Sequence, residues 1–116
     1  MFDRRKKLPA QFYRLPSGRE PVRDWFLALS VEDRRIVGKD VQKVEYGWPL
    51  GMPVCRPLSK GLWEVRSSLT SGRIARVLFA VVGAQMVLLH AFIKKSQKTP
   101  ADDLALARRR QKEIDG

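Results

Sequence analysis

The chain has 116 residues, the length of a single domain spanning residues 1–116, and hydrophobic residues make up 44% of it, which excludes a compositionally disordered chain. Its 23 Lys and Arg residues against 12 Asp and Glu residues leave a formal net charge of +11. Because such a charge repels itself in the compact state, it predicts a polyanionic partner, with nucleic acid ahead of an anionic membrane surface.

Targeting and metal-binding signals are weak. The most apolar stretch, residues 74–93, is interrupted by Arg76 and His90, so we do not interpret it as a membrane span. No apolar segment follows the basic N-terminus, which argues against a secretory signal. The only cysteine, Cys55, cannot form an internal disulfide and fits a reducing, cytoplasmic location. One cysteine and one histidine also exclude a Cys/His zinc site, and we expect neither metal nor cofactor.

The first part of the chain predicts a strand and then a helix. Residues 11–14 form a short strand-like run between two prolines. Ser17 and Glu20 have the spacing of a capping box, and Pro21 suits the first helical turn. The predicted inner face of this first helix carries Val22, Phe26 and Leu29, with Trp25 beside them.

A second helix is predicted over residues 31–46. Ser30 and Asp33 repeat the capping pattern at its start, and Gly47 is a natural stop. Trp48 follows in a loop, a position from which its ring could stack on a base.

The rest of the chain predicts a meander and a last helix. Residues 62–69, 73–82 and 85–94 read as strands joined by short turns, and residues 54–56 could add a brief strand. A helix follows Pro100, and its thin apolar stripe predicts weak docking or a partner. The fold class is therefore α+β, with an N-terminal strand and two helices packed on a twisted, mainly antiparallel four- to five-stranded sheet, plus a C-terminal helix.

Strand alternation gathers charged side chains on one face of the meander. The opposite face is apolar and should pack on the two N-terminal helices. The cluster on the partly open face comprises Glu64, Arg66, Arg76, His90, Lys94, Lys95 and Lys98. Cations beside one carboxylate and one imidazole suggest contact with nucleic acid, although a solvated sheet edge is the alternative.

These residue types fit metal-free cleavage of RNA. Attack of a 2′-hydroxyl on the adjacent phosphorus needs a base, a cation for the phosphoryl oxygens and an acid for the leaving oxygen. Arginine and lysine suit the cationic role. Glu64, His90 or a lysine shifted by its cationic neighbours could move the proton. Glu64 is equally open to a simple ion pair with Arg66 or Arg76.

Three segments carry a resemblance to a known family. Gly-Leu-Trp-Glu-Val-Arg stands at residues 61–66, Arg-Val-Leu-Phe at 76–79 and Leu-Leu-His-Ala-Phe-Ile-Lys-Lys-Ser-Gln-Lys-Thr-Pro at 88–100. With the order of elements, they resemble the RelE/ParE toxin superfamily, in particular its HigB-like, phage-derived branch, from about Phe12 to Ile114. The resemblance implies the toxin of a type II toxin–antitoxin module, a metal-independent, ribosome-dependent mRNA endoribonuclease that inhibits translation.

The resemblance also implies partners and site residues. The partners are mRNA on the ribosome with contacts to ribosomal RNA, a helix-turn-helix antitoxin, and promoter DNA only through the toxin–antitoxin complex. Arg66 falls where RelE-type enzymes place a strand lysine, Arg76 falls on the phosphate-stabilising arginine, and Lys95 or Lys94 falls near a cation at the end of the last strand. Further RNA contacts are expected from Lys60, Arg73, Ser96 and Lys98.

Two departures from the family pattern affect the proton-transfer roles. Glu64 sits where some relatives have a basic residue, and no tyrosine follows Tyr46. Either His90 or a lysine would then replace the C-terminal tyrosine of RelE-type enzymes, or the role of that tyrosine is dispensable. Two other functions remain open: a ParE-like inhibitor that binds DNA gyrase and needs no cationic cluster, and a degenerate remnant that only binds an antitoxin.

Overall fold

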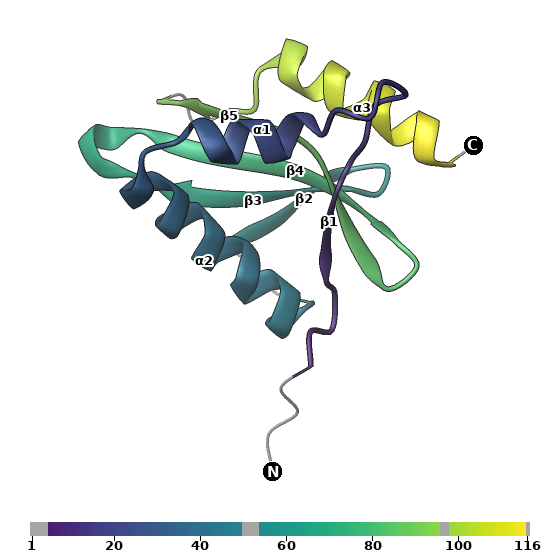
Figure 1. Ribbon diagram of the computed structural model, residues 1–116, viewed down its shortest axis with the longest axis horizontal. Helices are drawn as coiled ribbons and strands as arrows, with labels where there is room; N and C mark the ends of the chain where they lie inside the picture. Colours follow the sequence, from purple (N-terminus) through teal and green to yellow (C-terminus); the bar gives the residue numbers. More distant parts are fainter. Residues whose placement is uncertain (1–4, 50–53, 96–97, 116) are drawn as a thin grey trace.

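The structure of the protein, a computed structural model, describes residues 5–49, 54–95 and 98–115 (Figure 1). It confirms the α+β class. The elements in chain order are β1 (Ala10–Phe12), α1 (Pro21–Ala28), α2 (Val31–Gly47), β2 (Cys55–Ser59), β3 (Leu62–Ser68), a 3₁₀ turn (Thr70–Gly72), β4 (Ile74–Val82), β5 (Gln85–Lys94) and α3 (Ala101–Asp115).

The strands form one mainly antiparallel sheet in the order β1-β5-β4-β3-β2. The three predicted strands of the meander are β3, β4 and β5. The possible brief strand at residues 54–56 also forms, as β2, and pairs with β3. β1 is the exception, because it pairs with β5 in parallel, although both N-terminal helices and the other strands lie between them in the sequence. A register shift between Leu78 and Phe79 leaves Leu89 without a partner on β4, so that Leu89 and His90 both face α3.

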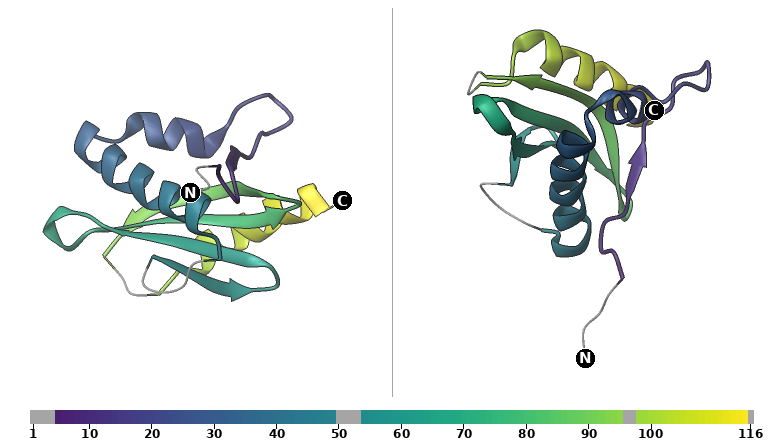
Figure 2. Two further views of the ribbon diagram at one scale, coloured as in Figure 1. Left: turned by 90° about the horizontal axis from the view of Figure 1, so that it is seen from below. Right: turned by 60° about the vertical axis from the view of Figure 1, so that its left-hand side comes forward.

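One face of the sheet carries the two N-terminal helices, and α3 lies on the other (Figure 2). α2 begins at Ser30, whose Oγ accepts a hydrogen bond of 3.1 Å from the Asp33 amide, as the capping pattern predicts. The inner face of α2 then buries Val37, Val41 and Val44 against the sheet.

The start of α1 differs from the prediction. Glu20 itself is the N-cap residue and makes no side-chain capping bond, while Ser17 Oγ accepts a bond of 3.4 Å from the Arg19 amide. The helix instead starts with Pro21, whose ring fixes a backbone angle suited to the first turn. The predicted capping box at Ser17 is therefore wrong, although the helix forms where expected.

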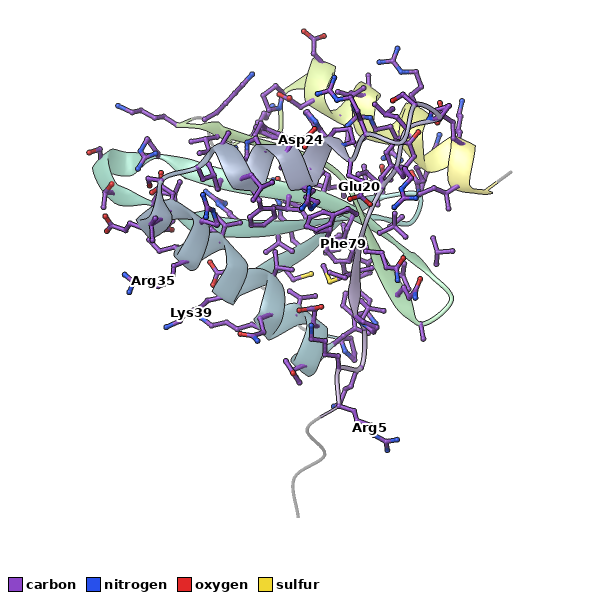
Figure 3. The ribbon with its side chains drawn as sticks, viewed as in Figure 1. Arg5, Glu20, Asp24, Arg35, Lys39 and Phe79 are labelled. Atoms are coloured by element: carbon purple, nitrogen blue, oxygen red, sulfur yellow. The ribbon has the colours of Figure 1, made fainter. Side chains whose placement is uncertain are left out.

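Trp48 belongs to the core of this helical layer. Its ring meets Trp63 edge-on at 4.8 Å between centroids and Phe79 at 5.9 Å. Phe79 is fully buried between the helices and the sheet (Figure 3). The Trp48 ring therefore packs on aromatic side chains of the protein itself, and its position needs no stacking on a nucleic-acid base to explain it.

The helix α3 is docked more firmly than its thin stripe predicts. Ala107 is fully buried against a second core that contains Leu62, Leu78 and Leu89. Arg110 Nη1 adds a 2.7 Å hydrogen bond to the carbonyl oxygen of Leu89. Among the residues that the structure describes, no helix is long and apolar enough to cross a membrane.

Candidate functional site

The predicted charged residues lie in two adjacent rows across the sheet, on the face that carries α3. The strand register aligns Arg56, Glu64, Leu78 and His90 in one row. The next row consists of Arg66, Arg76 and Phe92. Strand alternation therefore brings Glu64, Arg66, Arg76 and His90 together, as the sequence predicts.

Glu64 lies at the centre of a buried ionic cluster. Its Oε2 is 2.6 Å from Arg56 Nε, and its Oε1 is 3.0 Å from Arg76 Nε. Thr99 Oγ1, from the segment that leads into α3, donates a 2.9 Å hydrogen bond to the same Oε1. Both Glu64 and Arg76 are fully buried, so the expectation that they lie on an open face is wrong.

Burial changes what these two residues can do. It lowers the pKa of the Arg76 guanidinium, while the Glu64 carboxylate acts in the opposite direction. Both carboxylate oxygens of Glu64 are engaged by Arg56, Arg76 and Thr99, which leaves this group poorly placed to accept a substrate proton. The geometry therefore supports Glu64 as an ion-pair partner of Arg76, the alternative to a role in proton transfer.

A second cluster surrounds His90 and depends on α3. His90 Nε2 lies 2.7 Å from Asp103 Oδ1, and Lys94 Nζ lies 3.2 Å from Asp103 Oδ2. The ring of Phe92 is next to both: its centroid is 5.6 Å from that of His90 and 5.9 Å from Lys94 Nζ. A carboxylate that binds one ring nitrogen fixes the orientation of the imidazole and directs the other nitrogen elsewhere.

Four residues of the site are not predicted from the sequence: Arg56, Phe92, Thr99 and Asp103. Asp103 did carry a signal, as an acidic residue in the first turn of a helix, but a favourable helix dipole explains that position equally well. Arg56 could be found only from the strand register, which places it opposite Glu64.

The exposed part of the charged face lies at the end of β5. The Lys94 side chain is 48% exposed, Lys95 and Lys98 are exposed, and Arg66 is half-buried. These cations can meet an anionic ligand without a rearrangement of the core. Ser96, predicted as an RNA contact, lies outside the described residues.

The phage derived protein Gp49-like family (DUF891) matches residues 24–112, which is more than half of the chain. The chain belongs to this family. It is a RelE/ParE-like toxin-type family, in agreement with the resemblance of the sequence. None of the curated proteins compared with the chain matches it.

The Gp49-like match contains both charged clusters. It begins within α1, runs through β2–β5 and ends in α3, so that Arg56, Glu64, Arg76, His90 and Asp103 all lie inside it. β1 lies outside the matched range. The structural unit that carries the clusters is therefore the same unit that defines the family.

Two other predicted RNA contacts of this Gp49-like protein lie away from the clusters. Arg73 binds Asp33 with both terminal nitrogens, at 2.9 and 3.1 Å, and so joins the start of β4 to α2 on the opposite side of the sheet. Lys60 lies in the β2–β3 turn, where its carbonyl oxygen accepts a 3.0 Å hydrogen bond from Gln111 Nε2 of α3. Neither side chain joins the rows around Glu64 and His90.

Metal ligands do not gather anywhere in the part of the chain that the structure describes. Within those ranges, no group of three or more His, Cys, Asp or Glu residues is placed to hold a metal ion. His90 and Asp103 together supply two such groups, and their short contact is an ion-pair or hydrogen-bond geometry.

Proposed function

We propose that this Gp49-like protein is the toxin of a type II toxin–antitoxin module in the HigB-like branch, and that it cleaves mRNA on the ribosome without a metal. One observation carries the proposal: the only histidine of the chain is held by Asp103 next to exposed lysines on one face of the sheet. The membership of a RelE/ParE-like toxin-type family supports it.

In the proposed reaction, His90 is the base. If Nε2–H donates to Asp103, the neutral ring presents Nδ1 as an acceptor for the 2′-hydroxyl proton. The 2′-oxygen then attacks the adjacent phosphorus and the 5′-oxygen leaves, which yields a 2′,3′-cyclic phosphate and a 5′-hydroxyl. Asp103 acts as a positioning residue, since it is oriented toward His90 and away from the reacting atoms.

Exposed cations would stabilise the charge on the phosphoryl oxygens. Arg66, Lys94 and Lys95 have the exposure that this role requires, and Lys94 or Lys95 could also protonate the leaving oxygen. Arg76 was predicted for the phosphate, but its burial beside Glu64 favours a positioning role between Arg66 and Phe92. Glu64 has the same supporting role.

The proposed partners follow from this activity. They are mRNA on the ribosome, ribosomal RNA, a helix-turn-helix antitoxin, and promoter DNA through the complex with that antitoxin. The site of action would be the cytoplasm, where the ribosomes are. The excess of cations would make each nucleic-acid contact weaken as salt rises.

Primer extension on cellular mRNA after induction of the protein tests the proposal. Cuts in phase with codons are expected for the wild-type protein, and they should disappear in the His90→Gln variant. The Arg23→Gln variant is a matched control, because Arg23 is exposed on α1 and the substitution is equally conservative in size. Uncut mRNA with arrested growth would refute the nuclease assignment. Cuts that persist in His90→Gln would instead refute the role of His90 as the base.

Gyrase inhibition is a second candidate with an observation in its favour. Arg76, His90 and Lys94 all have acidic partners within the folded chain, an arrangement that a protein acting by binding tolerates better than an enzyme. A supercoiling assay with purified DNA gyrase separates the two functions. Loss of supercoiling at protein concentrations that leave ribosome-bound mRNA intact would favour the gyrase inhibitor.

A further inference from the structure

A groove runs along α3 beside the β2–β3 turn, and none of its lining residues belongs to the two charged rows. It encloses about 860 Å³ between α3 and the β2–β3 turn. Its lining residues are Lys60, Asp102, Ala105, Leu106, Arg108, Arg109, Gln111 and Lys112. Two of them connect α3 to the β2–β3 turn. Arg108 Nη2 donates a 3.2 Å hydrogen bond to the carbonyl oxygen of Ser59, and Gln111 donates one to the carbonyl oxygen of Lys60. The groove is therefore a fixed feature of the fold.

The groove carries four cations and one carboxylate. Within the described ranges, none of the four forms an ion pair with an acidic side chain, in contrast to Arg56, Arg76 and Lys94. Arg108 binds Ser59, which is neutral. The positive charge of this groove is therefore not neutralised by the described part of the chain.

The floor of the groove includes two apolar side chains, Ala105 and Leu106, that belong to neither hydrophobic core. Asp102, Ala105, Leu106, Arg109 and Lys112 follow the spacing of a single stripe along α3. Leu106 is half-buried, yet it belongs to neither hydrophobic core, whereas Leu104 and Ala107 pack on the core beneath the helix. Ala105 and Leu106 therefore lie between the cations, so the groove offers apolar contact as well as positive charge.

We propose that this groove binds an acidic amphipathic segment of a protein partner. Its apolar side chains would cover Leu106 and Ala105, and its carboxylates would meet Lys60, Arg109 and Lys112. The inference goes beyond the proposed cleavage reaction, because no residue of the groove belongs to the His90 or Glu64 clusters.

The chemistry of the lining favours a protein segment over RNA. None of the eight lining residues is aromatic, so the groove offers no platform on which an unpaired base could stack. A phosphate backbone would use the cations but would leave Leu106 uncovered. An acidic helix with apolar residues on one side uses both parts of the surface.

Selection from a displayed library of random 16-residue peptides tests the proposal. The full-length protein should enrich acidic peptides with apolar residues at helical spacing. Their affinity should fall at least tenfold in the Arg109→Glu/Lys112→Glu variant and at least threefold in Leu106→Ser. The matched control is Arg35→Glu/Lys39→Glu, which changes the net charge equally on two α2 side chains that point away from the molecule (Figure 3).

The outcomes are distinct. Peptides that lose affinity in the groove variants and keep it in the control support the proposal, with melting temperatures confirming that each variant is folded. Equal losses in both charge-reversal variants would show a response to net charge alone and overturn it. Binding of a 12-nucleotide single-stranded RNA that is lost only in the groove variants, with peptide binding unchanged, would assign the groove to nucleic acid and overturn it as well. Because His90 is unchanged in all variants, codon-phased cleavage reports separately on the proposed function.

Discussion

Arg76 and Glu64 form an ion pair in which Nε lies 3.0 Å from Oε1 and both side chains are fully buried. A buried charge is tolerated only when its partners remain in place, because water no longer solvates it. Arg56 and Thr99 complete the bonds of the carboxylate from β2 and from the segment before α3. The cluster therefore ties β2, β3, β4 and the segment before α3 together on the face that carries the proposed RNA site.

Removal of one member of this pair should destabilise the fold. Arg76→Ala leaves the Glu64 carboxylate buried with fewer partners, and we expect the free energy of unfolding to fall by about 3 kcal/mol or more. Urea denaturation followed by tryptophan fluorescence measures the change. Arg35→Ala, on the exposed face of α2, should change it by less than about 0.5 kcal/mol. Equal stability of the two variants would show that the buried pair does not support the fold.

Asp103→Asn should change cleavage and RNA affinity in opposite directions. Loss of the carboxylate removes the orientation of His90, so that cleavage of ribosome-bound mRNA should fall roughly 10²-fold. It also releases Lys94 from its partner at 3.2 Å, so that binding of a short RNA should tighten. Filter binding and primer extension on the same preparations give the two values.

Asp102→Asn is the control for that prediction, because Asp102 occupies the same helical turn and lines the groove instead. It should leave cleavage unchanged. A variant at Asp103 that lost both cleavage and RNA affinity would point to a general structural role, and the positioning role would then be rejected.

Most of the fold could be predicted from local patterns. Alternation between the Gly83-Ala84 turn and the basic segment that starts at Lys95 gives β5 its observed bounds at Gln85 and Lys94, and the Ser30 cap gives α2 its start. The alternating pattern also places Glu64 and Arg76 on the same face of the sheet. Such features depend on neighbours in sequence or on strand periodicity, which the sequence displays directly.

The environment of the candidate site could not be predicted in the same way. Burial of Glu64 and Arg76 depends on where Arg56 and Thr99 lie, and both come from other segments. The docking of α3 depends on the complementarity of Ala107 with the sheet, which a thin apolar stripe does not reveal. Arg73 points to Asp33 instead of joining the other cations because it lies on the side of Ala75 and Val77, which pack toward the helices, and its partner comes from α2.

The pairing of Asp33 with Arg73 predicts a pH-dependent contribution to stability. The hydrogen bond from Arg73 holds the pKa of the Asp33 carboxyl below its ordinary value of 3.8. A lowered folded-state pKa adds stability above the unfolded value, and that stability is lost as pH falls through the folded value. The Asp33→Asn variant should therefore melt at a lower temperature than the wild-type protein at pH 7, and the difference should shrink below pH 3.8.

Melting curves by circular dichroism between pH 2 and 7 measure this difference. Asp24→Asn is the control, because Asp24 pairs with Arg19 at 3.4 Å on the exposed surface and should show little change at any pH. A constant difference for Asp33→Asn across the range would contradict the prediction.

Cys55 should be unreactive in the folded protein. Burial in β2, with a smaller contribution from the nearby Glu64 carboxylate, raises the pKa of its thiol to about 11. Since the thiolate is the nucleophile, little of the reactive form exists at pH 8, and the side chain is also shielded from reagent. Reaction with Ellman's reagent at pH 8 should be at least 10²-fold slower in buffer than in 8 M urea. The Cys55→Ser variant gives the background, and a folded-state rate close to the unfolded one would show that the interior around β2 opens readily.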